Sequence, residues 1–260
     1  ASSTSARLWF VTFGAQSVSD DERVAPWPAA AWGSGRVIAE EHPDRWGGLV
    51  DLPIEADARA YEVCAQHLVA AGGEDHAAVR GARRYVQRVV PMPADATPRR
   101  LQLDADGACL VTGGLGAIGL LLARRLVECG ARRVILVGRR GLPERSSWRS
   151  TPADSPDGQR IAAVLALEAL GASVHVAAVD VSDEAQLSAF LERYRAEAWP
   201  RIRGVIHAAG VLANALVERM DRATFDAGIR AKARGAMLLD AWLPDLDFFV
   251  VCSSIGAFVA

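Results

Sequence analysis

The stretch Ala108–Gly119, which reads ACLVTGGLGAIG, decides the fold. Its apolar beginning (ACLVT) predicts a strand, and the pattern GxGxxG follows at Gly114, Gly116 and Gly119. An amphipathic helix is expected directly afterwards, over 116–129. Glycines permit a tight turn and let the backbone approach a pyrophosphate, while the first helical turn supplies unpaired N–H groups. This order predicts a dinucleotide-binding unit, and the alternative is a purely structural glycine turn.

Strands and helices continue to alternate after this loop. We expect strands over 133–137, 174–180, 204–208 and 247–254, and helices over 159–170, 183–196 and 221–242. This alternation predicts an open, doubly wound parallel sheet with helices on both faces. Ligands bind such sheets in the crevice beyond the carboxyl ends of the strands.

A smaller unit is expected before the loop. Its strands are predicted over 8–13, 48–52 and 83–90, and its helices over 28–41 and 55–71. These elements indicate a small parallel α/β unit, and it carries no glycine-rich phosphate loop. The proline-rich segment 91–99 (PMPADATPR) is the best boundary. The fold class is therefore α/β with two Rossmann-like halves: a structural subdomain over 1–100 and a nucleotide-binding subdomain over 101–260.

Composition argues against several classes of function. The 260 residues are 51% hydrophobic and 23% charged with a formal net charge of -2, which gives no reason to expect nucleic-acid binding. No apolar run reaches membrane-spanning length, and the N-terminus lacks the features of a signal peptide. The five histidines and four cysteines are scattered without metal-ligand spacing. Free thiols in a reducing compartment are expected, which predicts a cytoplasmic location.

The end of the second strand after the loop indicates which cofactor is bound. It reads Gly138-Arg139-Arg140, about 20 residues past the glycines, where an NAD site normally has an acidic residue. A guanidinium fork instead suits the 2′-phosphate of NADPH. We assign this contact to Arg139 with help from Arg140; the alternative is two solvated arginines.

Two later strand ends complete the expected NADPH site. Asp180-Val181 is placed to contact the adenine ring, and the HAAG segment is expected near the cofactor ribose. The full set of predicted cofactor residues outside the arginine pair is Thr112, Gly113, Gly114, Leu115, Gly116, Ala117, Ile118, Gly119, Asp180, Val181, His207, Ala208, Ala209 and Gly210, with Lys232 added below.

Six motifs occur in a family-specific order: TGGLGAIG, VGRRG, VDVSD, HAAGV, KARGA and VCSSIG. In this order they resemble the ketoreductase domains of modular polyketide synthases, a branch of the short-chain dehydrogenases. Trp32–Pro53 (WGSGRVIAEEHPDRWGGLVDLP) resembles the structural subdomain of the same enzymes and makes a free-standing short-chain dehydrogenase the weaker reading. The resemblance implies NADPH-dependent reduction of a β-ketoacyl thioester on the phosphopantetheine arm of an acyl carrier protein, with other synthase domains as partners and no metal.

The resemblance also implies two catalytic residues. A KxxG motif places the catalytic lysine at Lys232, and Lys232 is the only lysine among the 29 basic residues. A compact ammonium can bond a ribose hydroxyl and acidify a neighbouring phenol, which a guanidinium does poorly; the alternative is a surviving surface lysine. The catalytic serine corresponds to Ser254, whose hydroxyl would bind the substrate carbonyl oxygen.

Two departures from the family pattern shape the remaining expectations. The family has a tyrosine and then an asparagine beyond the serine, whereas all three tyrosines here precede Ser254 and the chain stops at Ala260. We expect an interrupted segment that is incomplete at its C-terminus and inactive alone; a reductively inactive scaffolding domain is the alternative. Family members that form D alcohols carry an LDD motif, and residues 212–214 read LAN, which predicts an L alcohol.

Overall fold

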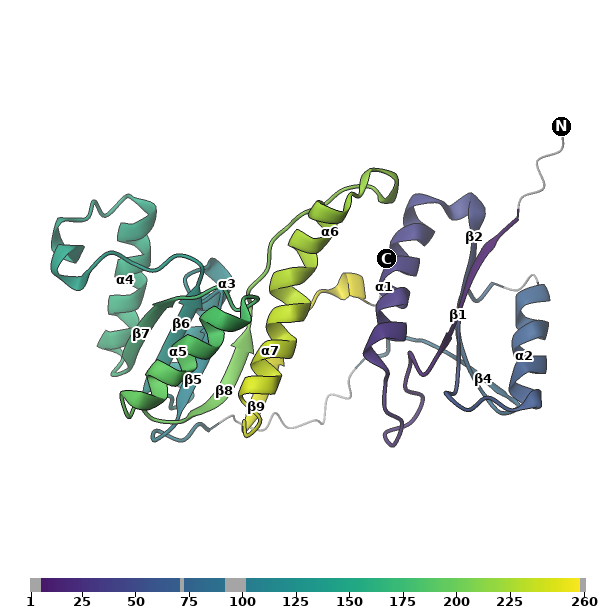
Figure 1. Ribbon diagram of the computed structural model, residues 1–260, viewed down its shortest axis with the longest axis horizontal. Helices are drawn as coiled ribbons and strands as arrows, with labels where there is room; N and C mark the ends of the chain where they lie inside the picture. The colour runs from purple at the N-terminus through teal and green to yellow at the C-terminus, as the bar shows by residue number, and fades with distance from the viewer. Residues whose placement is uncertain (1–5, 71–72, 92–101, 258–260) are drawn as a thin grey trace. The chain divides into compact units, whose positions relative to one another are not determined.

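The computed structural model describes residues 6–70, 73–91 and 102–257 (Figure 1). The chain divides into two compact units. The first unit comprises the described parts of Ala1–Ala96, Leu216–Arg219 and Ser253–Ala260, and the second those of Thr97–Ala215 and Met220–Cys252. The expected boundary segment, apart from Pro91, lies outside the described residues.

The first unit contains a four-stranded sheet in the order β1-β2-β3-β4. Strands β1, β2 and β3 are parallel, and β4 is antiparallel to β3. The expectation of a wholly parallel unit was therefore wrong, because a short strand was missed and the strand predicted over 83–90 turns back on it. The elements are β1 (Leu8–Phe13), α1 (Pro26–Glu41), β2 (Trp46–Leu52), α2 (Ala58–Val69), β3 (His76–Arg80) and β4 (Arg83–Val86), with short 3₁₀ turns at Pro43–Arg45, Val217–Arg219 and Ile255–Ala257.

The second unit contains a five-stranded parallel sheet in the order β7-β6-β5-β8-β9. This confirms the predicted doubly wound sheet. Its elements are β5 (Ala108–Thr112), α3 (Ala117–Glu128), β6 (Arg133–Gly138), a 3₁₀ turn (Arg145–Ser150), α4 (Pro156–Ala169), β7 (Ser173–Ala178), α5 (Glu184–Ala196), β8 (Ile202–His207), α6 (Arg222–Ile229), a π-helical turn (Arg230–Arg234), α7 (Gly235–Trp242) and β9 (Phe248–Val251).

Helices cover both faces of this sheet (Figure 1). Successive residues of the central strand β5 point to opposite faces, as a period of two requires. Leu110 packs in the cluster that includes Leu187 of α5 and Leu239 of α7. Val111 packs in the cluster that includes Leu126 of α3. All of β5 is buried, so the loop that follows it rests on a fully packed strand.

Side-chain caps fix where four helices begin. Asp57, Ser155, Asp183 and Asp221 precede α2, α4, α5 and α6, and each side chain accepts a hydrogen bond from a backbone N–H in the first turn. Such caps satisfy N–H groups that have no partner within the helix. Asp57 explains why α2 begins three residues later than the sequence predicted.

The helix expected over 221–242 is interrupted. It consists of α6 and α7 joined by the π-helical turn Arg230–Arg234, which has Lys232 at its centre. Helix patterning in the sequence does not distinguish a π turn from an α turn. Turns of this kind are rare and often occur at functional sites.

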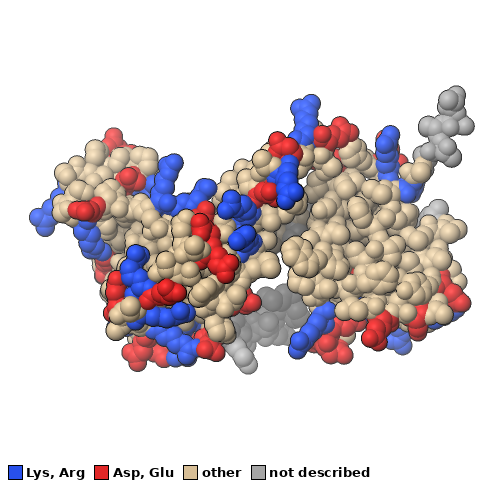
Figure 2. All heavy atoms as spheres, in the orientation of Figure 1, with Lys and Arg blue, Asp and Glu red and all other residues tan. Residues whose placement is uncertain are grey.

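The described surface is mixed in charge. Figure 2 shows acidic and basic side chains interspersed on the visible face of each unit. Among the described residues, no helix has the length and apolar character needed to span a bilayer. The cysteines are free, and burial raises the pKa of the Cys109 thiol to about 11, which makes this thiol unreactive.

Candidate functional site

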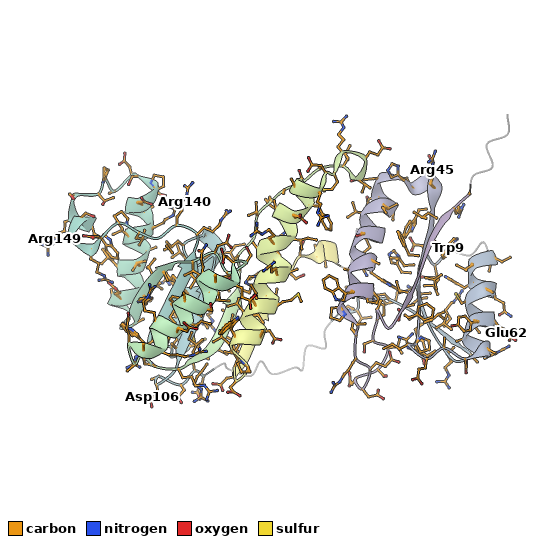
Figure 3. All side chains as sticks on the ribbon, viewed as in Figure 1. Trp9, Arg45, Glu62, Asp106, Arg140 and Arg149 are labelled. Carbon is orange, nitrogen blue, oxygen red and sulfur yellow. The ribbon has the colours of Figure 1, made fainter. Side chains whose placement is uncertain are left out.

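A cleft of about 720 Å³ opens at the carboxyl end of the second unit's sheet. The chain runs outward from β5 through β6 to β7 and then crosses back to β8 on the other side of β5. This reversal of strand order is where open α/β sheets bind ligands. Figure 3 shows the two ends of the sheet: Asp106 precedes β5, and Arg140 follows β6 at the cleft end.

Most of the predicted cofactor residues line this cleft. They come from the segments that follow four neighbouring strands: Thr112, Gly113, Leu115, Gly116, Arg139, Arg140, Asp180, Val181, Ala208, Ala209 and Gly210. The other predicted residues, Gly114, Ala117, Ile118, Gly119, His207 and Lys232, are not among the lining residues. Gly114 lies against Leu136 behind the loop, and residues 117–119 begin α3.

The glycine loop forms a cradle that side chains would fill. Gly113 has a φ of +63°, and a Cβ there would lie 2.8 Å from the carbonyl oxygen of Ala208. A Cβ on Gly119 would lie 2.3 Å from the carbonyl oxygen of Gly113, which is a steric overlap. Gly116 caps α3 without a side-chain hydrogen bond. The first turn of α3 therefore offers backbone N–H groups and the positive end of the helix dipole to an anion.

Three arginines line the cleft: Arg139, Arg140 and Arg160. Within the described part of the chain, no side-chain hydrogen bond or ion pair engages Arg139 or Arg140. Arg160 lies on α4, and its Nη1 donates to Asp157 at 3.0 Å. The sequence analysis missed Arg160. The sequence did predict a helix after the strand that ends in Arg139 and Arg140. That prediction does not indicate which residue of the helix faces the cleft.

Asp180 faces the cleft as a carboxylate. Burial opposes its ionisation, but hydrogen bonds from the side chain and backbone of Ser182 and the nearby charges of Arg230 and Arg139 hold the pKa of Asp180 below its ordinary value. The Ser182 hydroxyl and N–H donate to Asp180 Oδ1 at 2.7 and 3.0 Å. The side chain is thus held in one orientation at the end of the strand.

His207 does not face the cleft as the sequence analysis expected. It is the last residue of β8 and is 2% exposed. Its Nδ1 lies 2.7 Å from Thr112 Oγ1, and its Nε2 lies 3.0 Å from the carbonyl oxygen of Lys232. The strand alternation places this side chain inside the unit, so ring contact with a ribose is not its role here.

Lys232 lies on the π-helical turn, next to one of the residues that line the cleft. A Cβ on Gly210, a lining residue, would lie 3.2 Å from Lys232 Cε. The lysine stem therefore lies over Gly210, with its ammonium group beyond. The other predicted catalytic residue, Ser254, follows β9 and is exposed. It belongs to the first unit, and its relation to Lys232 stays a prediction.

Among the described residues, no group of three or more His, Cys, Asp or Glu side chains could hold a metal ion. The chemistry that the cleft offers comes from backbone N–H groups, three guanidinium groups and one carboxylate, with the Lys232 side chain next to the lining residue Gly210. Together these groups suit a phosphorylated ligand.

Comparison with known proteins identifies the family. The KR domain model matches residues 107–260, and a model described as the Rossmann fold domain of the polyketide synthase extender module SpnB matches residues 1–89. The chain is 40% identical to 5-methyl-1-naphthoate synthase of Streptomyces sahachiroi over 96% of its length and 41% identical to erythronolide synthase EryA3 of Saccharopolyspora erythraea over 98%. It spans 14% and 8% of those two synthases.

Solved structures agree with this assignment. The ketoreductase PlmKR1, from the first module of phoslactomycin biosynthesis in Streptomyces sp. HK803, superposes with a TM-score of 0.81 at 38% identity. The match covers 98% of this chain and 56% of that one. An A1-type ketoreductase gives a TM-score of 0.78 at 37% identity over 96% of this chain and 50% of its own. The chain belongs to the ketoreductase (KR) domain family of modular polyketide synthases.

Proposed function

We propose that this chain binds NADPH and serves the reduction of a β-ketoacyl thioester to a β-hydroxyacyl thioester. The observation that carries the proposal is the cleft at the switch point of the second unit, with its glycine cradle and three arginines. The acyl chain would be presented on the phosphopantetheine arm of an acyl carrier protein.

The residues of the cleft fit NADPH. The cradle at Gly113 and Gly119 leaves room for a pyrophosphate against the first turn of α3. Arg139, with Arg140 and Arg160 on the same wall, suits a 2′-phosphate, which NADH lacks. The strand end at Asp180 is open to an adenine ring. The preference for NADPH over NADH is thus supported by the positive charge of these arginines at the expected position of the 2′-phosphate.

Bound NADPH supplies hydride to the β-carbonyl carbon, and the protein positions the reactants and handles the proton. As the carbonyl carbon gains hydride, its oxygen becomes an alkoxide that must take a proton. We assign the Ser254 hydroxyl to donate a hydrogen bond to this oxygen. The Lys232 ammonium bonds the cofactor ribose and lowers the pKa of the phenol that the family uses as proton donor. General acid catalysis of this kind contributes 10²–10⁴-fold.

The subdomain roles are also part of the proposal. Residues 1–100 act as a structural subdomain and residues 101–260 bind the cofactor. The partners are the acyl carrier protein and the other domains of the synthase, and the location is the cytoplasm. The support is that the matched relatives are large synthases of which this chain spans a small share, and that the described cysteines are free.

Two measurements test the proposal. Titration of the chain with NADPH, followed by nicotinamide fluorescence, tests binding. Incubation of the ketoreductase domain containing the chain with NADPH and a β-ketoacyl thioester, followed by mass spectrometry, tests reduction. We expect saturable NADPH binding and a product heavier by two hydrogens, with turnover at least about 100-fold lower in Lys232→Ala.

The outcomes separate the alternatives. Lys232→Arg is the matched control, because it keeps the positive charge but replaces the compact ammonium with a planar fork; we expect it to restore little activity. A domain that binds NADPH but leaves the thioester unreduced would support a scaffolding role. Absence of NADPH binding would contradict the proposal altogether.

A further inference from the structure

A buried hydrogen-bond chain joins the glycine loop to the π-helical turn through His207. The Nδ1 atom of His207 lies 2.7 Å from Thr112 Oγ1, and its Nε2 atom lies 3.0 Å from the carbonyl oxygen of Lys232. The backbone N–H of Ala209 donates to Thr112 Oγ1 at 3.1 Å. Thr112 is fully buried and His207 is 2% exposed, so water does not compete for these bonds.

Only one arrangement of protons satisfies every atom of this chain. The Lys232 carbonyl can only accept, so Nε2 of His207 must carry the proton and donate. Nδ1 of a neutral imidazole then accepts, which makes the Thr112 hydroxyl its donor. The Thr112 oxygen in turn accepts from Ala209. Burial lowers the pKa of His207 despite the opposing backbone carbonyls of Lys232 and Ala231, which keeps the ring neutral.

The contact with His207 coincides with the distortion of the helix. In the π-helical turn, the N–H of Gly235 is directed to the carbonyls of both Arg230 and Lys232. The His207 ring adds a donor from outside the helix to the second of these carbonyls. A side chain inserted into a helix ladder is a known cause of local distortion.

Gly235 leaves room for the His207 ring beside the helix. A Cβ at that position would lie 3.1 Å from Cε1 of His207. A side chain at position 235 would therefore force the His207 ring or Val181 to shift by a few tenths of an ångström. The spacing of Lys232 and Gly235 in the KxxG motif thus has a physical reason: the glycine admits the histidine that holds the lysine's own carbonyl.

We propose that His207 is a positioning residue that fixes Lys232 for the ketoreductase reaction through the Lys232 carbonyl. The bond anchors the turn from which the lysine stem crosses Gly210 toward the cleft. Thr112, at the end of β5, is hydrogen-bonded to the same ring. The glycine loop and Lys232 are therefore held in a fixed position relative to each other. The inference rests on the proposed function, in which Lys232 acts on the cofactor ribose and the proton donor.

The size of the effect follows from the geometry. Lys232 is exposed, and its flexible stem lies next to Gly210 at the cleft. The position of its backbone therefore determines which positions the ammonium group can reach. A misplacement of about 1 Å in an active site can cost about 100-fold in rate. We expect loss of the His207 bond to lower turnover about 10- to 100-fold.

Two substitutions separate the two ends of the ring. In His207→Gln the amide nitrogen can take the place of Nε2 and donate to the Lys232 carbonyl. In His207→Asn the shorter side chain reaches the Thr112 side only. We expect the asparagine variant to lose turnover at saturating NADPH and substrate and the glutamine variant to keep most of it. His175→Gln is the control for loss of a partly buried histidine, because His175 packs among Phe190, Tyr194 and Trp199.

A spectroscopic readout does not depend on turnover. Lys232 is the only lysine among these 260 residues, so in protein labelled with ¹³C at the lysine carbonyl its signal is the one that disappears in Lys232→Ala. We expect that signal to move in His207→Asn and to stay near its original position in His207→Gln and His175→Gln. If His207 served stability alone, the asparagine variant would have a lower melting temperature, but the chemical shift of the Lys232 carbonyl would not change.

Combination with Lys232→Ala decides between the two proposals. Turnover is measured per NADPH-binding site in the ketoreductase domain containing the chain. If His207 acts through Lys232, His207→Asn adds little to the loss already caused by Lys232→Ala. Full turnover and an unmoved carbonyl signal in His207→Asn, with Lys232→Ala inactive, would overturn the positioning role and leave the proposed function intact. Full turnover in Lys232→Ala would overturn the proposed function and the inference with it.

Discussion

Replacing Arg139 with alanine should weaken NADPH binding far more than NADH binding. Arg139 follows β6 at the cleft wall, and within the described part of the chain its guanidinium group has no hydrogen-bond partner. The 2′-phosphate is the only group that distinguishes the two cofactors. A variant that removes a phosphate contact therefore changes one dissociation constant and leaves the other nearly unchanged.

The expected magnitude follows from the exposure of this wall. A hydrogen bond to a charged group contributes about 1.5–3 kcal/mol. Arg139 is exposed, so water screens the contact and the lower half of that range applies. With 1.4 kcal/mol for each factor of ten, a loss of 1.5–2 kcal/mol raises the Kd for NADPH about 10- to 30-fold. Arg160→Ala should have a smaller effect, because Asp157 already neutralises part of its charge.

The assay is a fluorescence titration of each variant with NADPH and with NADH at one fixed salt concentration. Arg149→Ala is the control: this exposed arginine lies in the second unit but is not among the residues that line the cleft (Figure 3). Equal weakening of both cofactors would mean that Arg139 supports the loop rather than the 2′-phosphate. An unchanged Kd for NADPH would mean that Arg139 does not contribute to NADPH binding.

Three further predictions concern other parts of the chain. Gly119→Ala should cost about 1–3 kcal/mol of stability and abolish NADPH binding in titrations, because its Cβ would overlap the loop backbone. Arg80→Ala should cost about 3–5 kcal/mol in denaturant unfolding, because it leaves the buried Asp51 without its cation. The hydrogen bond from Arg80 lowers the pKa of Glu22 below 4.5. The stability that this pair contributes is therefore full above pH 4.5 and is lost as the pH falls through the pKa of the folded state. This pH-dependent contribution to the free energy of unfolding should be absent from Arg80→Ala. Chiral analysis of the reduced product should show an L alcohol, since residues 212–214 read LAN; a D alcohol would contradict this.

The parts of the fold that could be predicted are those with a local cause. The apolar run of β5, its glycines and the start of the next helix are encoded within twelve consecutive residues, and the structure has them where the sequence predicts. The cleft-lining strand ends could be predicted for the same reason, because in a parallel sheet the carboxyl ends of all strands meet at one edge.

The missed features depend on contacts between distant residues. Strand β3 is only five residues long and owes its place to pairing with both β2 and β4. The π turn is in hydrogen-bond contact with a histidine 25 residues earlier in the chain. Arg160 lines the cleft because α4 packs beside β7. Hydrophobic periodicity reports local structure only, so it could not predict any of these contacts between distant residues.

The two units differ in the glycine loop that follows the first strand of each. Gly14, with a φ of +66°, directly follows β1, as Gly113, with +63°, directly follows β5. In the first unit, the N–H groups of Ala15 and Gln16 after that glycine donate to the buried carboxylate of Asp51 at 2.7 and 3.2 Å. In the second unit, the corresponding loop borders the cleft, and the register position that matches Asp51 holds the apolar residue Leu136. The first unit thus satisfies the N–H groups after its glycine with its own carboxylate, which is paired with Arg80. The second unit has no acid at the matching position, which is consistent with the phosphate site that we propose for its loop.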